Sequence, residues 1–303
     1  MHRILAFACA SALALVFGAC SRDDPPTPPT AHRVPSSTTS TTTSTTTSTS
    51  IVLPTTTTSP AGPPQAATTP DGLAQQILES ETAIRNPTTL AVDLPRLGHT
   101  QQVAYRAVSQ NLAIKDEVLA KLPAELRAVA DANITANAKL RSMITKPKET
   151  LPAWRIIAPA PAEELLSHYK AAEAEIGVGW TYLAAIHLVE TRMGRIRGTS
   201  VAGAQGPMQF IPSTWKQYGA GGDINDNRQA IFAAARLLEN NGAPGDMRNA
   251  VWNYNHDARY VDAVLAFASE MQRNERAFLG YHGWQVYYVT TKGDVWLSEG
   301  YGG

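Results

Sequence analysis

The chain has 303 residues, of which 44% are hydrophobic, and its 26 basic residues balance its 26 acidic residues. A chain of this length can bury a sizeable core. Its net charge of zero excludes bulk electrostatic capture of nucleic acid, so we expect no nucleic-acid partner. The only cysteines, Cys9 and Cys20, lie near the N-terminus. The rest of the chain therefore has neither disulfides nor thiol chemistry.

The first segment is an apolar run from Ile4 to Ala19. It is too short for an ordinary membrane span and is typical of a secretory signal, so we assign residues 1–19 to a signal peptide. The ending Gly-Ala-Cys resembles a bacterial lipobox, which implies a lipid on Cys20 after cleavage, although Phe17 stands where leucine is usual. We expect an exported protein, lipid-anchored on the outer face of the cell membrane; plain secretion and an uncleaved signal anchor are the alternatives.

Residues 20–69 are rich in serine, threonine and proline and contain few charges. Such a segment cannot bury enough apolar surface to fold, so we expect a disordered linker behind the lipid. The linker either lifts the rest of the chain away from the membrane or is a simple solvated spacer, and these two interpretations are compatible.

Three helices are predicted between residues 70 and 160. Thr69-Pro70-Asp71 is typical of a helix start, with a capping hydroxyl, a first-turn proline and an acid at the positive end of the dipole. Two more helices are predicted over about 97–111 and 123–143 from their apolar spacing. This helical extension either braces the domain that follows or contributes to ligand binding. We expect bracing, because no aromatic-rich or motif-bearing stretch occurs in it.

The next predicted helices cover about 161–175 and 180–190, and the second of these ends on Glu190. Residues four and seven positions before Glu190 are apolar and share its face of the helix. A carboxyl group there meets apolar walls and the negative end of the helix dipole, and both raise its pKa. A raised pKa suits a general acid that works near neutral pH. The alternative is a solvated glutamate paired with Arg192 or Arg195.

A glycine-rich loop follows Glu190. Gly203 and Gly206, with small residues between them, allow the backbone to approach a ligand closely. A new helix is predicted to begin at Pro212, a favoured first-turn residue. Further helices are predicted over about 231–238 and 257–274.

The C-terminal residues change character. Two apolar, aromatic-rich runs flank Lys292-Gly293, which predicts a β-hairpin. Its aromatic side chains either stack on a ligand or close the core, and we favour closure of the core.

Together these residues resemble the lytic transglycosylases of bacterial cell walls, within the lysozyme-like superfamily. The motifs that carry the resemblance are Glu190-Thr191, Ser200, the run from Gly203 to Thr214, Trp252-Asn253-Tyr254-Asn255 and Tyr260-Val261. The match covers roughly residues 161–274. Pro207 and His256-Asp257 depart from the leucine and the alanine-glycine that many members have, and neither change removes a group that the chemistry needs.

The resemblance implies a mainly α fold. A lysozyme-like catalytic domain over residues 161–274 would follow the helical extension, residues 70–160, and precede the small C-terminal β-hairpin, residues 275–303.

The resemblance also implies a reaction. Glu190 would act as the single acid and base that cleaves the β-1,4 bond between N-acetylmuramic acid and N-acetylglucosamine in peptidoglycan strands, with a 1,6-anhydromuramoyl product. No acidic residue occurs between Thr191 and Gly222, which fits one carboxylate rather than the two of ordinary glycosidases. The implied substrate-binding residues are Ser200, Gln205, Met208, Gln209, Tyr254 and Asn255. We expect neither cofactor nor metal, because His187 has no partner histidine at a metal-binding spacing.

Two alternatives stay open. A hydrolysing muramidase of the same superfamily would use Asp223 or Asp226 to position water. A non-catalytic peptidoglycan-binding module would keep the fold alone, but pure binding does not require an acid with a raised pKa. The arginines after Glu190 either meet carboxylates of the substrate's peptide stems or form an ordinary solvated face.

Overall fold

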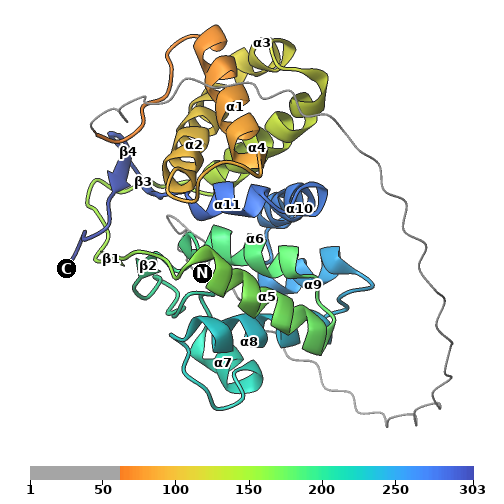
Figure 1. The fold of residues 1–303 in the computed structure, drawn as a ribbon. Helices are drawn as coiled ribbons and strands as arrows, with labels where there is room; N and C mark the ends of the chain where they lie inside the picture. Colours follow the sequence, from red (N-terminus) through yellow and green to blue (C-terminus); the bar gives the residue numbers. More distant parts are fainter. Residues whose placement is uncertain (1–61) are drawn as a thin grey trace, which may run out of the picture. The chain divides into compact units, whose positions relative to one another are not determined.

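The structure, a computed structural model, describes residues 62–303, which are mainly helical (Figure 1). Within this range, residues 64–303 form one compact unit with eleven α-helices and two small antiparallel sheets. The predicted signal peptide, Cys20 and most of the predicted linker lie outside the described residues. None of the helices in the described range is long and apolar enough to cross a membrane.

The predicted extension contains four α-helices and a short 3-10 helix. They are α1 (Pro70–Arg85), α2 (Leu94–Gln110), η1 (Leu112–Ile114), α3 (Lys115–Ala120) and α4 (Ala124–Ser142). The three predicted helices are confirmed, and α2 begins three residues earlier than predicted. Thr69 caps α1 as expected, because its hydroxyl accepts a hydrogen bond from the backbone N–H of Gly72 at 3.1 Å. Helix α3 is too short for its apolar periodicity to be recognised in the sequence.

Seven helices form the second part of the chain. They are α5 (Ala162–Ile176), α6 (Trp180–Thr191), α7 (Pro212–Tyr218), α8 (Asn227–Asn240), α9 (Met247–Tyr254), α10 (Ala258–Arg273) and α11 (Ala277–His282). The predictions of α5, α6, α7, α8 and α10 are confirmed. Helices α9 and α11 are additions, of which α9 carries the Trp252–Asn255 motif.

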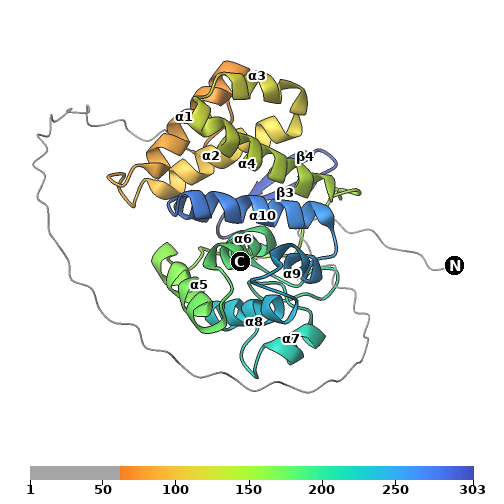
Figure 2. The same cartoon turned by 90° about the vertical axis from the view of Figure 1, so that its right-hand side faces the viewer.

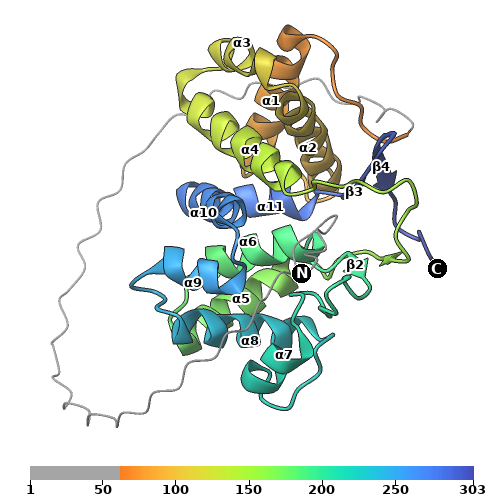
Figure 3. The same cartoon turned by 180° about the vertical axis from the view of Figure 1, so that it is seen from behind.

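Helix α10 lies between the helices of the extension and helix α6, as Figures 2 and 3 show. One side of α10 packs on α4 and the other on α6, while α11 packs on α2. A single hydrophobic cluster includes residues of the extension, such as Tyr105 and Ile134, together with Leu183 and Phe267 of the later helices. The extension therefore covers the side of α10 that faces away from α6, which is the contact that bracing requires.

The predicted C-terminal hairpin is confirmed as β3 (Val286–Thr290) paired with β4 (Gly293–Leu297). A second antiparallel pair joins β1 (Arg155–Ile156) to β2 (Ile196–Arg197). Side chains of both pairs form a small second core, which contains Ile156, Ile196, Val286, Tyr288 and Leu297. The hairpin thus closes a core, as favoured from the sequence.

A buried carboxylate connects the extension to the C-terminal part. Glu81 of α1 is 1% exposed and accepts hydrogen bonds from Arg85 of the same helix and from Gln101 and Tyr105 of α2. Gln101 in turn accepts a hydrogen bond from the indole N–H of Trp284, at 2.8 Å. The Glu81 carboxylate at the centre of this network accepts hydrogen bonds from three donors. Removal of Glu81 therefore leaves several buried groups unpaired.

We predict that Glu81→Ala lowers the free energy of unfolding by about 3 kcal/mol or more, because it breaks a buried hydrogen-bonded ion pair. Urea unfolding of the purified protein measures this quantity. Glu79→Ala, an exposed position on the same helix, is the matched control and should change it by about 0.5 kcal/mol or less. Equal effects of the two substitutions would contradict the prediction.

Candidate active site

Glu190 lies in the last turn of α6 and is 3% exposed. Its Oε1 accepts a hydrogen bond from the hydroxyl of Tyr260 on α10, at 2.6 Å. Its Oε2 is buried and has no hydrogen-bond partner among the described residues. Within residues 62–303, the carboxyl group therefore has one oxygen held by a hydrogen bond and one without a hydrogen-bond partner.

Burial raises the pKa of Glu190 well above its ordinary value of 4.5, and the Tyr260 hydrogen bond and the charge of Arg192 offset this only in part. The predicted direction is confirmed, with burial as the main cause. The alternative of a solvated glutamate is wrong, since the side chain is enclosed. Arg195, one of its suggested partners, is itself 5% exposed and donates to the carbonyl of His282.

Thr191 fixes the chain where α6 ends. Its hydroxyl donates to the carbonyl of Pro207 and accepts from the backbone N–H of Gly194, at 3.0 Å. Arg192 and Met193 then adopt left-handed backbone conformations, with φ of 55° and 59°, which side chains disfavour. The two hydrogen bonds of Thr191 stabilise this sharp turn and bring the glycine-rich loop against the end of α6.

The loop has one position that only glycine can occupy. Gly206 has a φ of 73°, and a Cβ atom there would lie 1.9 Å from the carbonyl oxygen of Ile224. On either side of Gly206, Gln205 and Phe210 exchange two backbone hydrogen bonds of 2.9 Å. The loop is thus a tight, internally bonded turn packed on the residues that precede α8.

Tyr254 connects this loop to α9. Its hydroxyl donates to the carbonyl of Met208 at 2.6 Å, and its ring meets that of Phe210 edge to face. Burial and the nearby charge of Glu190 raise the pKa of Tyr254, and burial likewise raises that of Tyr260. Both phenols therefore stay protonated near neutral pH and can act as neutral donors around the carboxyl group.

The other predicted site residues are held within the loop or the core. The Ser200 hydroxyl accepts from the backbone N–H of Ala204, and the Gln209 amide donates to the carbonyl of Gly206. The side chain of Met208 is fully buried in the hydrophobic cluster. Asn255 is 2% exposed, and its Oδ1 has no partner in the described part of the chain. These contacts shape the loop; none of them is a hydrogen bond to Glu190.

Two residues of the site were not among those selected from the sequence. Thr191 and Tyr260 were noted only as members of the motifs, yet they make the closest contacts that position Glu190 and its loop. The available signal for Tyr260 was its place on the apolar face of the predicted helix 257–274. A tyrosine on a buried face usually directs its hydroxyl to a polar partner.

The nearest aspartates have structural roles. Asp226 caps α8 by accepting from the backbone N–H of Gln229 at 2.8 Å, and Asp223 accepts from the N–H of Asn225 at 2.9 Å. Neither forms a hydrogen bond to Glu190. Within residues 62–303, no group of three or more histidine, cysteine or acidic side chains is arranged to hold a metal ion. His187 is buried against the hydroxyl of Tyr169.

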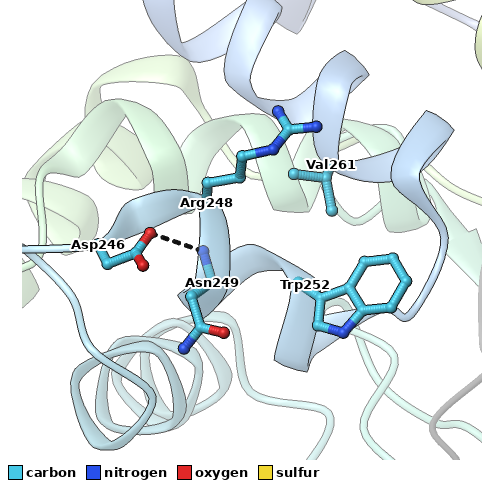
Figure 4. A pocket seen from close by; sticks show the side chains of 5 residues that line it. All are labelled: Asp246, Arg248, Asn249, Trp252 and Val261. Atoms are coloured by element: carbon cyan, nitrogen blue, oxygen red, sulfur yellow. Dashed lines mark hydrogen bonds between the residues drawn. The ribbon is translucent and has the colours of Figure 1, made fainter.

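A pocket of about 280 Å³ opens beside α9 and the start of α10 (Figure 4). It is lined by Asp246, Arg248, Asn249, Trp252 and Val261. The Trp252 side chain is 40% exposed. The pocket lies beside the helices that carry Tyr254 and Tyr260, but neither tyrosine lines it.

The raised pKa of Glu190 predicts a pH-dependent effect of Glu190→Gln on stability. The unfolded chain loses this proton near pH 4.5, whereas the folded protein keeps it to higher pH. The free energy of unfolding of the wild-type protein therefore decreases as the pH rises above 4.5. The melting temperature of Glu190→Gln relative to wild type should therefore rise between pH 4.5 and about pH 8. The rise should be about 2–4 °C for each kcal/mol by which the difference in free energy of unfolding between the two proteins changes.

Thermal unfolding at the two pH values measures the effect, with Glu79→Gln as the exposed reference. A difference between Glu190→Gln and wild type that stays constant with pH, or falls, would show that the folded protein does not hold this proton more tightly.

No protein-family model matches the chain. Searches of curated proteins and of solved structures likewise found no match. The function is therefore inferred from the residues and contacts described above.

Proposed function

We propose that this protein is a lytic transglycosylase that cleaves the β-1,4 bond between N-acetylmuramic acid and N-acetylglucosamine in peptidoglycan. The observation that carries the proposal is the buried Glu190 carboxyl group, which has a raised pKa and one oxygen without a hydrogen-bond partner among the described residues. The motif resemblance around Glu190 supplies the reaction, and the fold assigned with it is the lysozyme-like one.

In this mechanism, Glu190 donates its proton to the glycosidic oxygen as the bond to the muramoyl C1 breaks. The N-acetyl group of the same sugar stabilises the cationic carbon. The Glu190 carboxylate then accepts the proton of the muramoyl C6 hydroxyl, whose oxygen forms the new bond to C1. The enzyme ends in its starting protonation state, and no water is consumed.

Tyr260 is suited to support both steps. Its hydroxyl donates to Oε1, so it holds the carboxyl group in one orientation and leaves Oε2, which has no partner within residues 62–303, to act on the reacting oxygen. After the first proton transfer, the same hydrogen bond stabilises the carboxylate. A neutral donor does this without the large decrease in pKa that an ion pair with arginine or lysine would cause.

The hydrogen bonds that the two nearby aspartates make favour this reaction over hydrolysis. A muramidase needs a second carboxylate that positions water, and the available candidates are Asp223 and Asp226. Their oxygens cap α8 and the loop before it, and they make no contact with Glu190. A single acid that serves in turn as the base requires no such partner.

The pocket beside α9 adds surface for a glycan strand. Its exposed indole, that of Trp252, presents an apolar ring (Figure 4). The lining residues Asn249 and Arg248 are held in place, since the amide of Asn249 donates to the carbonyl of Asn241 and Arg248 pairs with Asp262. We assign this pocket to a sugar ring outside the scissile bond.

Export and anchoring complete the proposal. A lipid on Cys20 would hold the protein on the outer face of the cell membrane, and the Ser/Thr/Pro-rich residues after it would let the folded part reach the wall.

We predict that Glu190→Gln lowers the rate of release of soluble fragments from purified sacculi by at least about 100-fold, because glutamine cannot deliver the proton. Co-sedimentation of the variant with sacculi should stay at the wild-type level, since the amide has nearly the same shape. Near-normal turnover in this variant would contradict the assignment of the acid.

Asp223→Asn and Asp226→Asn, singly and together, are the matched controls in the same assay. They remove a carboxylate without removing the proposed acid, and should lower the rate by about tenfold or less through loop and cap effects. A collapse of turnover in either aspartate variant, with the fold preserved, would favour the muramidase.

The anchor is tested by a separate prediction. Cys20→Ser, expressed from the full-length gene, should move the protein from the membrane fraction to the soluble fraction, because serine cannot carry the lipid. Immunoblots of the two fractions measure the shift. Continued pelleting with the membranes would instead favour an uncleaved signal anchor.

A further inference from the structure

The short pair of β1 and β2 places two arginines directly opposite each other. Arg155 pairs with Arg197, and Ile156 pairs with Ile196. Opposite residues of an antiparallel pair share a face, and consecutive residues alternate between faces. Since the two isoleucines are buried in the second core, the two arginines lie on the other face.

The strand register places two like charges opposite each other, which destabilises a strand pair. Burial and the charge of Arg155 lower the pKa of Arg197, while the charge of Asp223 raises it and offsets part of this effect. Neither arginine belongs to any of the ion pairs within residues 62–303. The carboxylate of Asp223 is hydrogen-bonded to Asn225.

The arginine pair lies one loop away from the proposed catalytic residues. Arg197 donates to the carbonyl of Asn225 at 3.2 Å. The preceding residue, Ile224, packs its carbonyl against Gly206 of the glycine-rich loop. That loop continues to Met208, whose carbonyl accepts the hydrogen bond of Tyr254. These contacts connect Arg197 to the surroundings of Glu190.

We infer that Arg155 and Arg197 together bind a carboxylate of the peptide stem that muramoyl residues carry, so that the protein prefers stem-bearing glycan to glycan without stems. The inference rests on the proposed function for its substrate. Two arginine side chains from opposite positions of one strand pair suit a carboxylate, because each guanidinium group offers paired N–H donors and its charge remains at every physiological pH. The anion relieves the repulsion that the strand register imposes on the free protein.

The test uses binding, so that it does not depend on turnover. Uncross-linked peptidoglycan strands that carry stems are coupled to beads by their ends, and one half of the beads is treated with an amidase that removes the stems. Binding is measured by co-sedimentation with the beads near physiological ionic strength, with every variant built on Glu190→Gln. Arg155→Gln/Arg197→Gln should weaken binding to the stem-bearing strands by about tenfold and leave binding to the stripped strands within about twofold.

Lys146→Gln/Lys292→Gln is the control with the same loss of charge. Both lysines are exposed, and neither side chain has a hydrogen bond or ion pair in the described structure. This control should bind both kinds of strand like its parent. If the double arginine variant does not fold, Arg155→Gln alone decides the test, because that residue is exposed and its substitution should still weaken stem-dependent binding severalfold.

Equal loss of binding on both kinds of strand, or no loss on either, would overturn the inference. Failure of the proposed function has a different signature: wild-type protein would release no soluble fragments from sacculi, whatever the arginine variants do in the binding assay.

Discussion

The Glu190 carboxyl group is buried where α6 meets α10, with a single hydrogen-bond donor, and the surrounding structure is arranged around this constraint. A carboxyl group without water favours its protonated form, which makes it useful as an acid and costly as an anion. Tyr260 lowers that cost without removing it. Such a group destabilises the folded protein as the pH rises, so the neighbouring helices must be held firmly by other contacts.

The helical extension supplies part of that support. Helix α10 carries Tyr260, and its other side is covered by α4. Lys139 of α4 forms an ion pair with Asp262 at 2.7 Å, two residues beyond Tyr260. The extension also reaches the C-terminal hairpin, where Arg106 and Arg141 both pair with Asp294. Residues with no counterpart in the catalytic motifs thus fix the helix that orients the acid.

Much of this arrangement follows from local sequence signals. The capping Thr69 of α1 and the first-turn prolines of α1 and α7 marked the starts of these helices, and the apolar spacing before Glu190 predicted both a buried helix and a raised pKa. Helices α9 and α11 were not predicted, because segments of eight and six residues show too few turns for a clear period.

Contacts between residues far apart in the chain could not be predicted from local sequence patterns either. The burial of Arg195, the hydrogen bond from Tyr260 and the position of Arg155 opposite Arg197 join residues far apart in the chain. The side chain of Gln209 was unpredictable for a different reason: its backbone adopts a φ of 51°, which side chains disfavour, and its amide donates to the carbonyl of Gly206 in the same loop.

The central claim is that one carboxyl group serves as both acid and base, with the C6 hydroxyl of the substrate as the nucleophile. Mass spectrometry of the muropeptides that wild-type protein releases from sacculi tests it most directly. The account predicts 1,6-anhydromuramoyl ends, lighter than the hydrolysis products by the mass of one water molecule. Reducing muramoyl ends, or incorporation of label from ¹⁸O water at the cleaved bond, would contradict it.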